Sequence, residues 1–155
     1  MRIFGVDPGS QRTGYGCIET RDSRHHVIVC GVLTAPQRAA LPEKLVAMHS
    51  GLAKLLAEYR PDALAIEDLF YAKNVRSALI LGHVRGVLML AASEACVPIS
   101  EYSPTEVKSA VVGYGRAEKR QVQQMVTLLL NMSTDRKSTR LNSSHLSGSR
   151  MPSSA

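Results

Sequence analysis

The stretch Arg2-Ile3-Phe4-Gly5-Val6-Asp7-Pro8-Gly9-Ser10, at the start of the chain, decides the fold. Its apolar residues predict a buried strand, and Pro8-Gly9-Ser10 ends that strand with a turn. Because a proline favours an extended backbone at the residue before it, we expect the Asp7 carboxylate at the C-terminal tip of the strand. Open α/β sheets build their sites at this edge. Asp also commonly begins an ordinary turn, so the stretch alone leaves both roles open.

A second apolar segment, Asp62–Glu67, also finishes on a carboxylate. It follows residues 41–59, whose apolar side chains recur at helical spacing and predict a helix that Arg60-Pro61 ends. Strand, helix and strand in this order imply a right-handed crossover that brings the second strand parallel to an earlier one. If the two strands are neighbours, Asp7 and Glu67 lie at the same edge of the sheet.

The other patterns predict further strands at the start of the chain and helices at its end. Alternating residues in 13–20 and 26–34 predict two strands of an antiparallel meander, joined by a polar turn. Beyond Glu67 we expect a helix over 72–95, a strand over 97–100, and helices over 104–112 and 117–132. The sequence therefore predicts an α/β fold, with a mixed sheet of meander and parallel strands flanked by helices.

Composition restricts the class of protein. With 155 residues, 45% of them hydrophobic, the chain is long enough for one domain with a proper core. Cys17, Cys30 and Cys96 lack C-x-x-C spacing, which favours free thiols and the cytoplasm. No apolar run approaches the roughly 18 residues of a membrane span, and no secretory signal pattern is present. The net charge of +6 favours an anionic partner, with nucleic acid first.

The last 21 residues differ from the rest, because apolar periodicity stops at Asp135 and Ser becomes frequent. Residues 135–145 resemble the in-frame translation of a common sequencing-library adapter; an ordinary disordered basic tail is the alternative. We therefore expect one domain over residues 1–134 and a disordered, non-native tail over 135–155. Residues 1–134 hold 15 Lys and Arg against 12 Asp and Glu, so their net charge is only +3.

Two carboxylates at neighbouring strand tips suit a hard cation such as Mg²⁺. Two such ions hydrolyse phosphodiesters by activating water and stabilising the leaving oxygen, a chemistry that usually needs more than two acidic residues. Asp68 would point to the opposite side of the strand, so we expect it to be a solvated neighbour. A surface charge at the strand end is the alternative role for Glu67.

Basic and aromatic residues accompany these carboxylates. The cluster Leu69-Phe70-Tyr71-Ala72-Lys73-Asn74 suits unstacked bases and phosphates, although an aromatic there could also fill the core. Positive side chains that could contact phosphate or simply be solvated are Arg76, Arg85, Lys108, Arg116, Lys119 and Arg120. No phosphate-loop, zinc-protease or nucleophile-elbow motif is present, and a second phosphate loop of the actin-like ATPases is absent. A hydrolytic metal site is the enzymatic hypothesis that residues support.

Collinear motifs from Met1 to Met132 resemble the bacterial RuvC Holliday-junction resolvases. These motifs are Asp7-Pro8-Gly9-Ser10, Thr13-Gly14-Tyr15-Gly16, Ala65-Ile66-Glu67, Phe70-Tyr71-Ala72-Lys73-Asn74, Ser77-Ala78-Leu79, Arg85-Gly86 and Ala117-Glu118-Lys119. The resemblance implies an RNase H-like fold, a homodimer, two Mg²⁺ ions that Mn²⁺ could replace, and paired nicks that resolve four-way DNA junctions in recombination and repair. It also implies cooperation with the RuvA–RuvB branch-migration complex.

The resemblance also implies residue roles. Asp7 and Glu67 match the first two metal-binding catalytic carboxylates. The residues expected to bind DNA are Phe70, Lys73, Asn74, Arg76, Lys108 and Lys119. The helix around Gly82 and Gly86 would lie at the dimer interface.

The chain departs from this family in its C-terminal part. The family has a last helix with an Asp-Ala-Ala-Asp-type pair, which adds two carboxylates to the site, and nothing here matches it. Asp135 is the only acidic residue after Glu118, and we assign it no role because its context is adapter-like. We therefore expect a truncated, inactive chain that lacks the final helix. A module that binds branched DNA without cutting it is the alternative.

Overall fold

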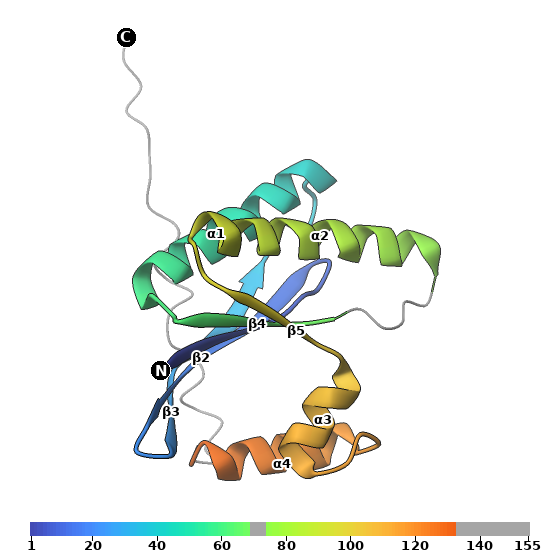
Figure 1. Cartoon of the computed structure of the whole chain (residues 1–155). Coiled ribbons are helices and arrows are strands. Elements are labelled where there is room, and N and C mark those ends of the chain that lie inside the picture. The colour runs from blue at the N-terminus through green and yellow to red at the C-terminus, as the bar shows by residue number, and fades with distance from the viewer. Residues whose placement is uncertain (69–73, 133–155) are drawn as a thin grey trace.

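The computed structural model describes residues 1–68 and 74–132 (Figure 1). Their elements in chain order are β1 (Arg2–Asp7), β2 (Arg12–Arg21), β3 (Arg24–Thr34), α1 (Leu41–Tyr59), β4 (Ala63–Glu67), α2 (Val75–Glu94), β5 (Ile99–Tyr102), α3 (Pro104–Val112) and α4 (Lys119–Leu129).

The five strands form one mixed sheet in the order β3-β2-β1-β4-β5. β1 pairs antiparallel with β2, and β2 antiparallel with β3, so the expected meander is confirmed. β1 also pairs parallel with β4, and β4 parallel with β5. The crossover through α1 therefore makes β4 the parallel neighbour of β1, as the order of elements predicted.

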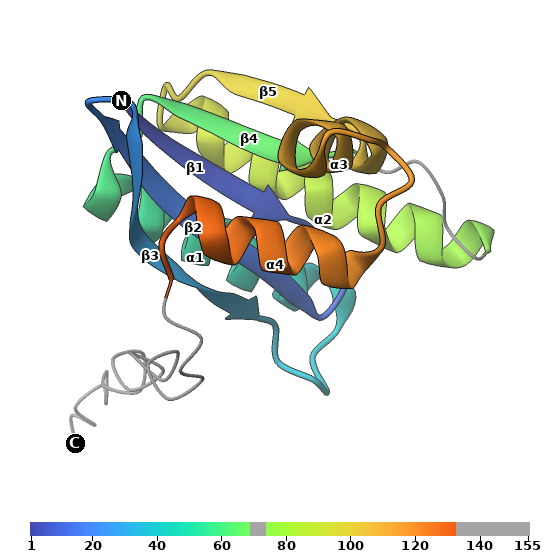
Figure 2. The ribbon, with the colours of Figure 1, turned by 90° about the horizontal axis from the view of Figure 1, so that it is seen from below.

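The helices divide between the two sides of the sheet, with α1 and α2 on one and α3 and α4 on the other (Figure 1). Viewed from the second side, α4 runs across β1 and β2 (Figure 2). The core lies between the sheet and the first helix pair. Its fully buried members include Phe4 from β1, Leu64 from β4, Leu52 from α1 and Leu88 from α2.

The second helix pair is much less buried than the first. α1 and α2 contribute seven fully buried residues to the core, whereas neither α3 nor α4 has one. Apolar side chains near the end of α4 are exposed, and Leu128 retains 73% of its accessible surface. In the described part of the chain, little apolar surface therefore holds α4 to the sheet.

Local signals place most element boundaries. Asn74 caps α2, since its Oδ1 accepts the Ser77 N–H at 2.9 Å. The Ser103 hydroxyl accepts the Glu106 N–H at the start of α3, and Glu106 accepts the Ser103 N–H in return. Hydrogen bonds from Ser103 lower the pKa of Glu106, and the bond from the Ser103 backbone N–H has a larger effect than the bond from its hydroxyl. The predicted boundaries were wrong at β5, which begins two residues later than expected and continues to Tyr102, and at α4, which begins two residues later and ends three residues earlier than expected.

The expectation about membrane-length segments also needs correction. α2 has 20 residues with a mean hydropathy of 1.4, so by length and composition it could cross a membrane. The structure nevertheless packs it against the sheet and α1 through Val84, Leu88, Ala91 and Ala92. Its apolar character therefore serves the core on one side and leaves an exposed face on the other.

The turn after β1 is held by one buried hydroxyl. Thr13, fully buried on β2, accepts the Gly9 N–H at 3.3 Å and donates to the Gly9 carbonyl at 3.4 Å. The backbone passes so close that a Cβ on Gly9 would lie 2.1 Å from the Arg12 carbonyl oxygen. Only glycine therefore fits the turn that directly follows Asp7.

Replacing Gly9 by Ala should lower the free energy of unfolding by about 1–3 kcal/mol, because a backbone atom must move to admit the methyl group. Urea unfolding measures the change. Gly5→Ala in the same stretch is the matched control, since its Cβ would meet nothing closer than the Gly16 carbonyl at 3.8 Å. Equal unfolding midpoints for the two variants would show that the turn is not tightly constrained.

Candidate active site

Two carboxylates meet at the C-terminal edge of the parallel strands. The β1–β4 register pairs Val6 with Ile66, and the next residues along the two strands are Asp7 and Glu67. Since side chains alternate along a strand and Val6 and Ile66 are buried, both carboxylates lie on the side away from α1 and α2. The expected juxtaposition of Asp7 and Glu67 is thus present in the structure.

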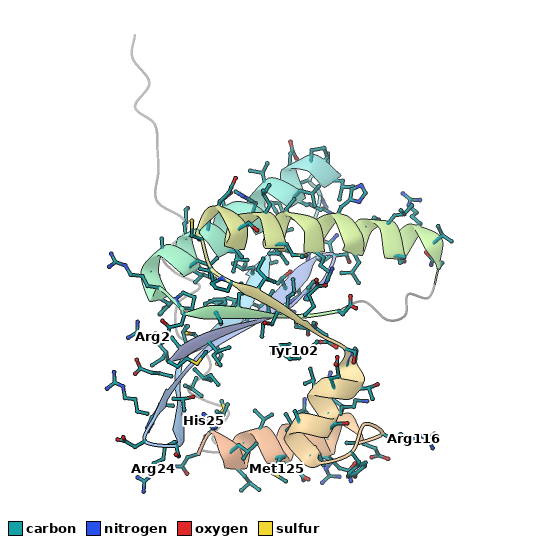
Figure 3. The ribbon with its side chains drawn as sticks, in the orientation of Figure 1. Arg2, Arg24, His25, Tyr102, Arg116 and Met125 are labelled. Carbon is teal, nitrogen blue, oxygen red and sulfur yellow. The ribbon has the colours of Figure 1, made fainter. Side chains whose placement is uncertain are left out.

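The row of residues across the sheet continues on both sides of the carboxylate pair. Asp7 pairs with Gly14 of β2, and Glu67 pairs with Tyr102 of β5. A Cβ on Gly14 would lie 3.7 Å from the Asp7 Cβ and 3.9 Å from its Oδ2, so glycine leaves that side of the carboxylate open. Tyr102 is exposed on the sheet side that faces α3 and α4 (Figure 3). The carboxylates are therefore accessible between a glycine and a tyrosine.

The environment of Glu67 alters its acidity. Partial burial is the largest cause that raises the pKa of Glu67, and the charge of Asp7 and a hydrogen bond between the two side chains add to it. Lys108 of α3 acts in the opposite direction on the pKa of Glu67. Two carboxylates this close concentrate negative charge, which a divalent cation would relieve.

The structure gives different surroundings to the residues expected to bind DNA. Lys108 is half-buried, and its charge partly opposes the rise in the pKa of Glu67. Arg76 and Lys119 are exposed at the starts of α2 and α4. The Asn74 side chain is engaged in capping α2. Phe70 and Lys73 lie outside the described residues.

One basic residue differs from expectation. Asp68 is 46% exposed, as expected of a solvated neighbour, and it also forms an ion pair with Arg85 at 3.4 Å. Arg85 is only 16% exposed and also pairs with Glu101, so it is neither a solvated side chain nor a free phosphate contact. Sequence patterns missed this cluster because it joins three elements that are distant along the chain.

A third ligand is not found near the pair. In residues 1–68 and 74–132, no group of three or more His, Cys, Asp or Glu side chains could hold a metal ion. Tyr102 is the neighbour of Glu67 that sequence patterns missed, since the strand was expected to end before it. Only the β4–β5 register reveals it, and no sequence signal would have found it.

Comparison with known proteins gives consistent matches. The family model described as "Crossover junction endodeoxyribonuclease RuvC" matches residues 3–143. Proteins of that name from Syntrophotalea carbinolica and Koribacter versatilis are each 50% identical, over 132 and 133 residues; each alignment covers 85% of this chain, and 82% and 80% of those proteins.

Solved structures agree with these sequence matches. A Thermus thermophilus RuvC in complex with Holliday junction substrate superposes with a TM-score of 0.82 at 29% identity, covering 90% of this chain and 86% of that one. The yeast mitochondrial Holliday junction resolvase Ydc2 superposes with a TM-score of 0.60 over 80% of this chain and 60% of its own. Its identity is 16%, so this second match concerns the fold alone.

Removing one of the two carboxylates should stabilise the metal-free protein at neutral pH. Because the pKa of Glu67 is raised, the free energy of unfolding falls as the pH rises from the ordinary value of a glutamate, about 4.3, through that raised value. Asp7→Asn removes the neighbouring charge, so its melting temperature at pH 7.5 in EDTA should exceed the wild-type value by about 1–4 °C.

The difference between Asp7→Asn and wild type should shrink at pH 3, well below the ordinary glutamate pKa of about 4.3, because Glu67 is then mostly protonated in folded and unfolded chains alike. Asp22→Asn at the tip of the β2–β3 hairpin is the matched control and should not change the melting temperature at either pH. A lower melting temperature for Asp7→Asn at pH 7.5 would show that Asp7 stabilises the fold instead.

Proposed function

The chain belongs to the RuvC family of crossover junction endodeoxyribonucleases, and we propose that it acts on four-way DNA junctions through a Mg²⁺ site on Asp7 and Glu67. Its mixed sheet with helices on both sides is the RNase H-like fold that the resemblance implied. The observation that carries the proposal is the carboxylate pair at adjacent ends of parallel strands, accessible on the sheet face away from the core.

The donor set fits a hard cation. Asp7 and Glu67 offer carboxylate oxygens side by side, and partial burial together with the Asp7 charge raises the pKa of Glu67. When bound, two Mg²⁺ or Mn²⁺ ions supply an activated water and stabilisation of the leaving oxygen. Asp7 and Glu67 hold and orient the ions, and Gly14 keeps the space beside Asp7 open.

Cleavage requires more carboxylates than this pair, and the described residues supply no third one at the site. We propose that the family's last acidic helix completes the site, that residues 1–134 are the resolvase domain, and that residues 135–155 are a non-native tail. This proposal makes the 155-residue chain a junction-binding protein with little or no nuclease activity. A native protein that binds branched DNA without cutting it is the alternative.

Positive side chains near the carboxylates would hold the DNA. Lys108, whose charge acts on the pKa of Glu67, would contact the phosphate next to the metal site, and Lys119 and Arg76 would contact the backbone further away. The roles proposed for Phe70, Lys73 and Asn74 rest on the family resemblance. Such contacts fix the register of the junction and make its binding salt-dependent.

A second copy of the chain would pack on α2. Val75, Leu79 and Leu90 are exposed there, and a Cβ on Gly82 or Gly86 would meet no atom within 4 Å. These residues share one helix face, which the rest of the described chain leaves without a close neighbour. A homodimer would place two sites on one junction, in the cytoplasm and together with RuvA–RuvB.

The 155-residue chain should bind a synthetic four-way junction but fail to nick it symmetrically in Mg²⁺. Replacing residues 135–155 by the corresponding C-terminal segment of the Syntrophotalea carbinolica relative should restore cutting, because it adds the missing carboxylates. In that extended protein, Asp7→Asn or Glu67→Gln should lower the cleavage rate at least about 100-fold and leave the junction Kd within about twofold. Gel assays measure both quantities.

Three results would contradict this prediction. Symmetric nicking by the unextended chain would show that its own residues complete the site. An extended protein that binds without cutting would favour the non-cleaving binding module. Equal losses of binding and cutting in Asp7→Asn would show that the residue is structural.

Leu79→Glu should weaken self-association at least about 30-fold, because it places a charge in the proposed interface. Sedimentation velocity over a range of concentrations measures the change. Val46→Glu on α1 is the matched control, since Val46 is similarly exposed but lies outside this face. A wild-type chain that stays monomeric, or equal effects of the two variants, would contradict the α2 interface.

A further inference from the structure

Arg85 of α2 joins three elements next to the carboxylate pair. Its guanidinium forms ion pairs with Glu101 of β5 and, at 3.4 Å, with Asp68 just after β4. Its Nε also donates a long hydrogen bond, 3.5 Å, to the backbone carbonyl of Glu67. We refer to Arg85, Asp68, Glu101 and the Glu67 carbonyl as the Arg85 clamp.

The Arg85 clamp is not available for DNA. The Arg85 side chain is 16% exposed, and its single positive charge faces the two negative charges of Asp68 and Glu101. A phosphate arriving there would meet a net negative group and would have to displace existing ion pairs. The planar guanidinium of Arg85 can bond to two carboxylates at once, which suits this fixed network better than a transient contact with DNA phosphate.

The contact with Glu67 is made through the backbone and not through the carboxylate. Arg85 therefore leaves the carboxylate oxygens of Glu67 available for a cation, while the Glu67 main chain is tied to α2. The next residue continues the attachment, because the Asp68 N–H donates to the Tyr102 carbonyl at 2.8 Å and closes the end of the β4–β5 ladder. The Arg85 clamp therefore attaches the end of β4 to α2 at the position where the side chains of Asp7 and Glu67 lie next to each other.

We propose that Arg85 is a positioning residue, which ties the C-terminal end of β4 to α2 and so holds the Glu67 carboxylate beside Asp7. This inference rests on the proposed metal-binding role of Glu67. Metal ligands work only when the backbone that carries them is held within about 0.5 Å of the required geometry, and like charges push an unsupported pair apart.

The chain contains a matched control at the opposite end of the sheet. Arg2 begins β1, and its side chain pairs with Glu19 at 3.1 Å and donates to the Tyr59 carbonyl at 2.9 Å (Figure 3). It thus makes the same combination of carboxylate and backbone carbonyl. The Asp62 N–H, which donates to the Arg2 carbonyl at 2.9 Å, reports on that end as the Asp68 N–H reports on the other.

Amide hydrogen exchange on the full 155-residue chain tests the proposal, with Arg85→Gln compared with Arg2→Gln. After correction for the change in global stability, Arg85→Gln should speed exchange of the Asp68 amide at least about 10-fold and leave the Asp62 amide unchanged. Arg2→Gln should do the reverse. Arg85→Lys should restore part of the Asp68 protection, since an ammonium keeps the charge but lacks the fork.

Mn²⁺ binding to the same proteins, measured by calorimetry, adds a second readout. Arg85→Gln should weaken binding several-fold, whereas Arg2→Gln should not change it. Equal exchange effects of both variants on both amides, or an unchanged Asp68 amide in Arg85→Gln, would overturn the proposal. If neither the wild-type chain nor the chain extended as in the cleavage test bound Mn²⁺ but the exchange pattern held, the clamp would stand and the proposed metal role of Glu67 would fail.

Discussion

The parallel pairing of β1 with β4 is the constraint on which the rest of this structure depends. It sets Val6 against Ile66 in the core, so that the next residue of each strand, Asp7 and Glu67, emerges on the opposite face. A register shift of one residue would exchange buried and exposed side chains on that strand. The core and the candidate site are therefore specified by the same hydrogen-bond ladder.

That pairing also brings the carboxylates of Asp7 and Glu67 close together, which is electrostatically unfavourable. Neighbouring residues reduce this unfavourable interaction but do not remove it. Burial and the neighbouring Asp7 raise the pKa of Glu67, while Lys108 counteracts them from α3. Arg85 binds the Glu67 carbonyl and not its carboxylate, so the backbone is fixed and the carboxylate oxygens stay available. A cluster of like charges that the fold holds together, with a perturbed pKa, is characteristic of sites that bind a cation or a substrate.

The helices on the two faces of the sheet are buried to different extents. On one face, α1 and α2 close a core around Phe4, Leu64 and their neighbours. On the other, α3 and α4 have no fully buried residue, and apolar side chains at the end of α4 remain exposed. The less buried face is also the one that carries Asp7 and Glu67.

The sequence by itself determined the mixed sheet, most element boundaries and the pairing of Asp7 with Glu67. These follow from local signals, namely apolar periodicity, capping residues and prolines, together with the handedness of one crossover. Tertiary structure alone decided that Tyr102 lies beside Glu67 and that Arg85 is buried among carboxylates, where sequence patterns predicted a solvated or phosphate-binding cation. The physical reason is that strand register and side-chain ion pairs between distant segments depend on how elements pack, and no local pattern encodes their partners.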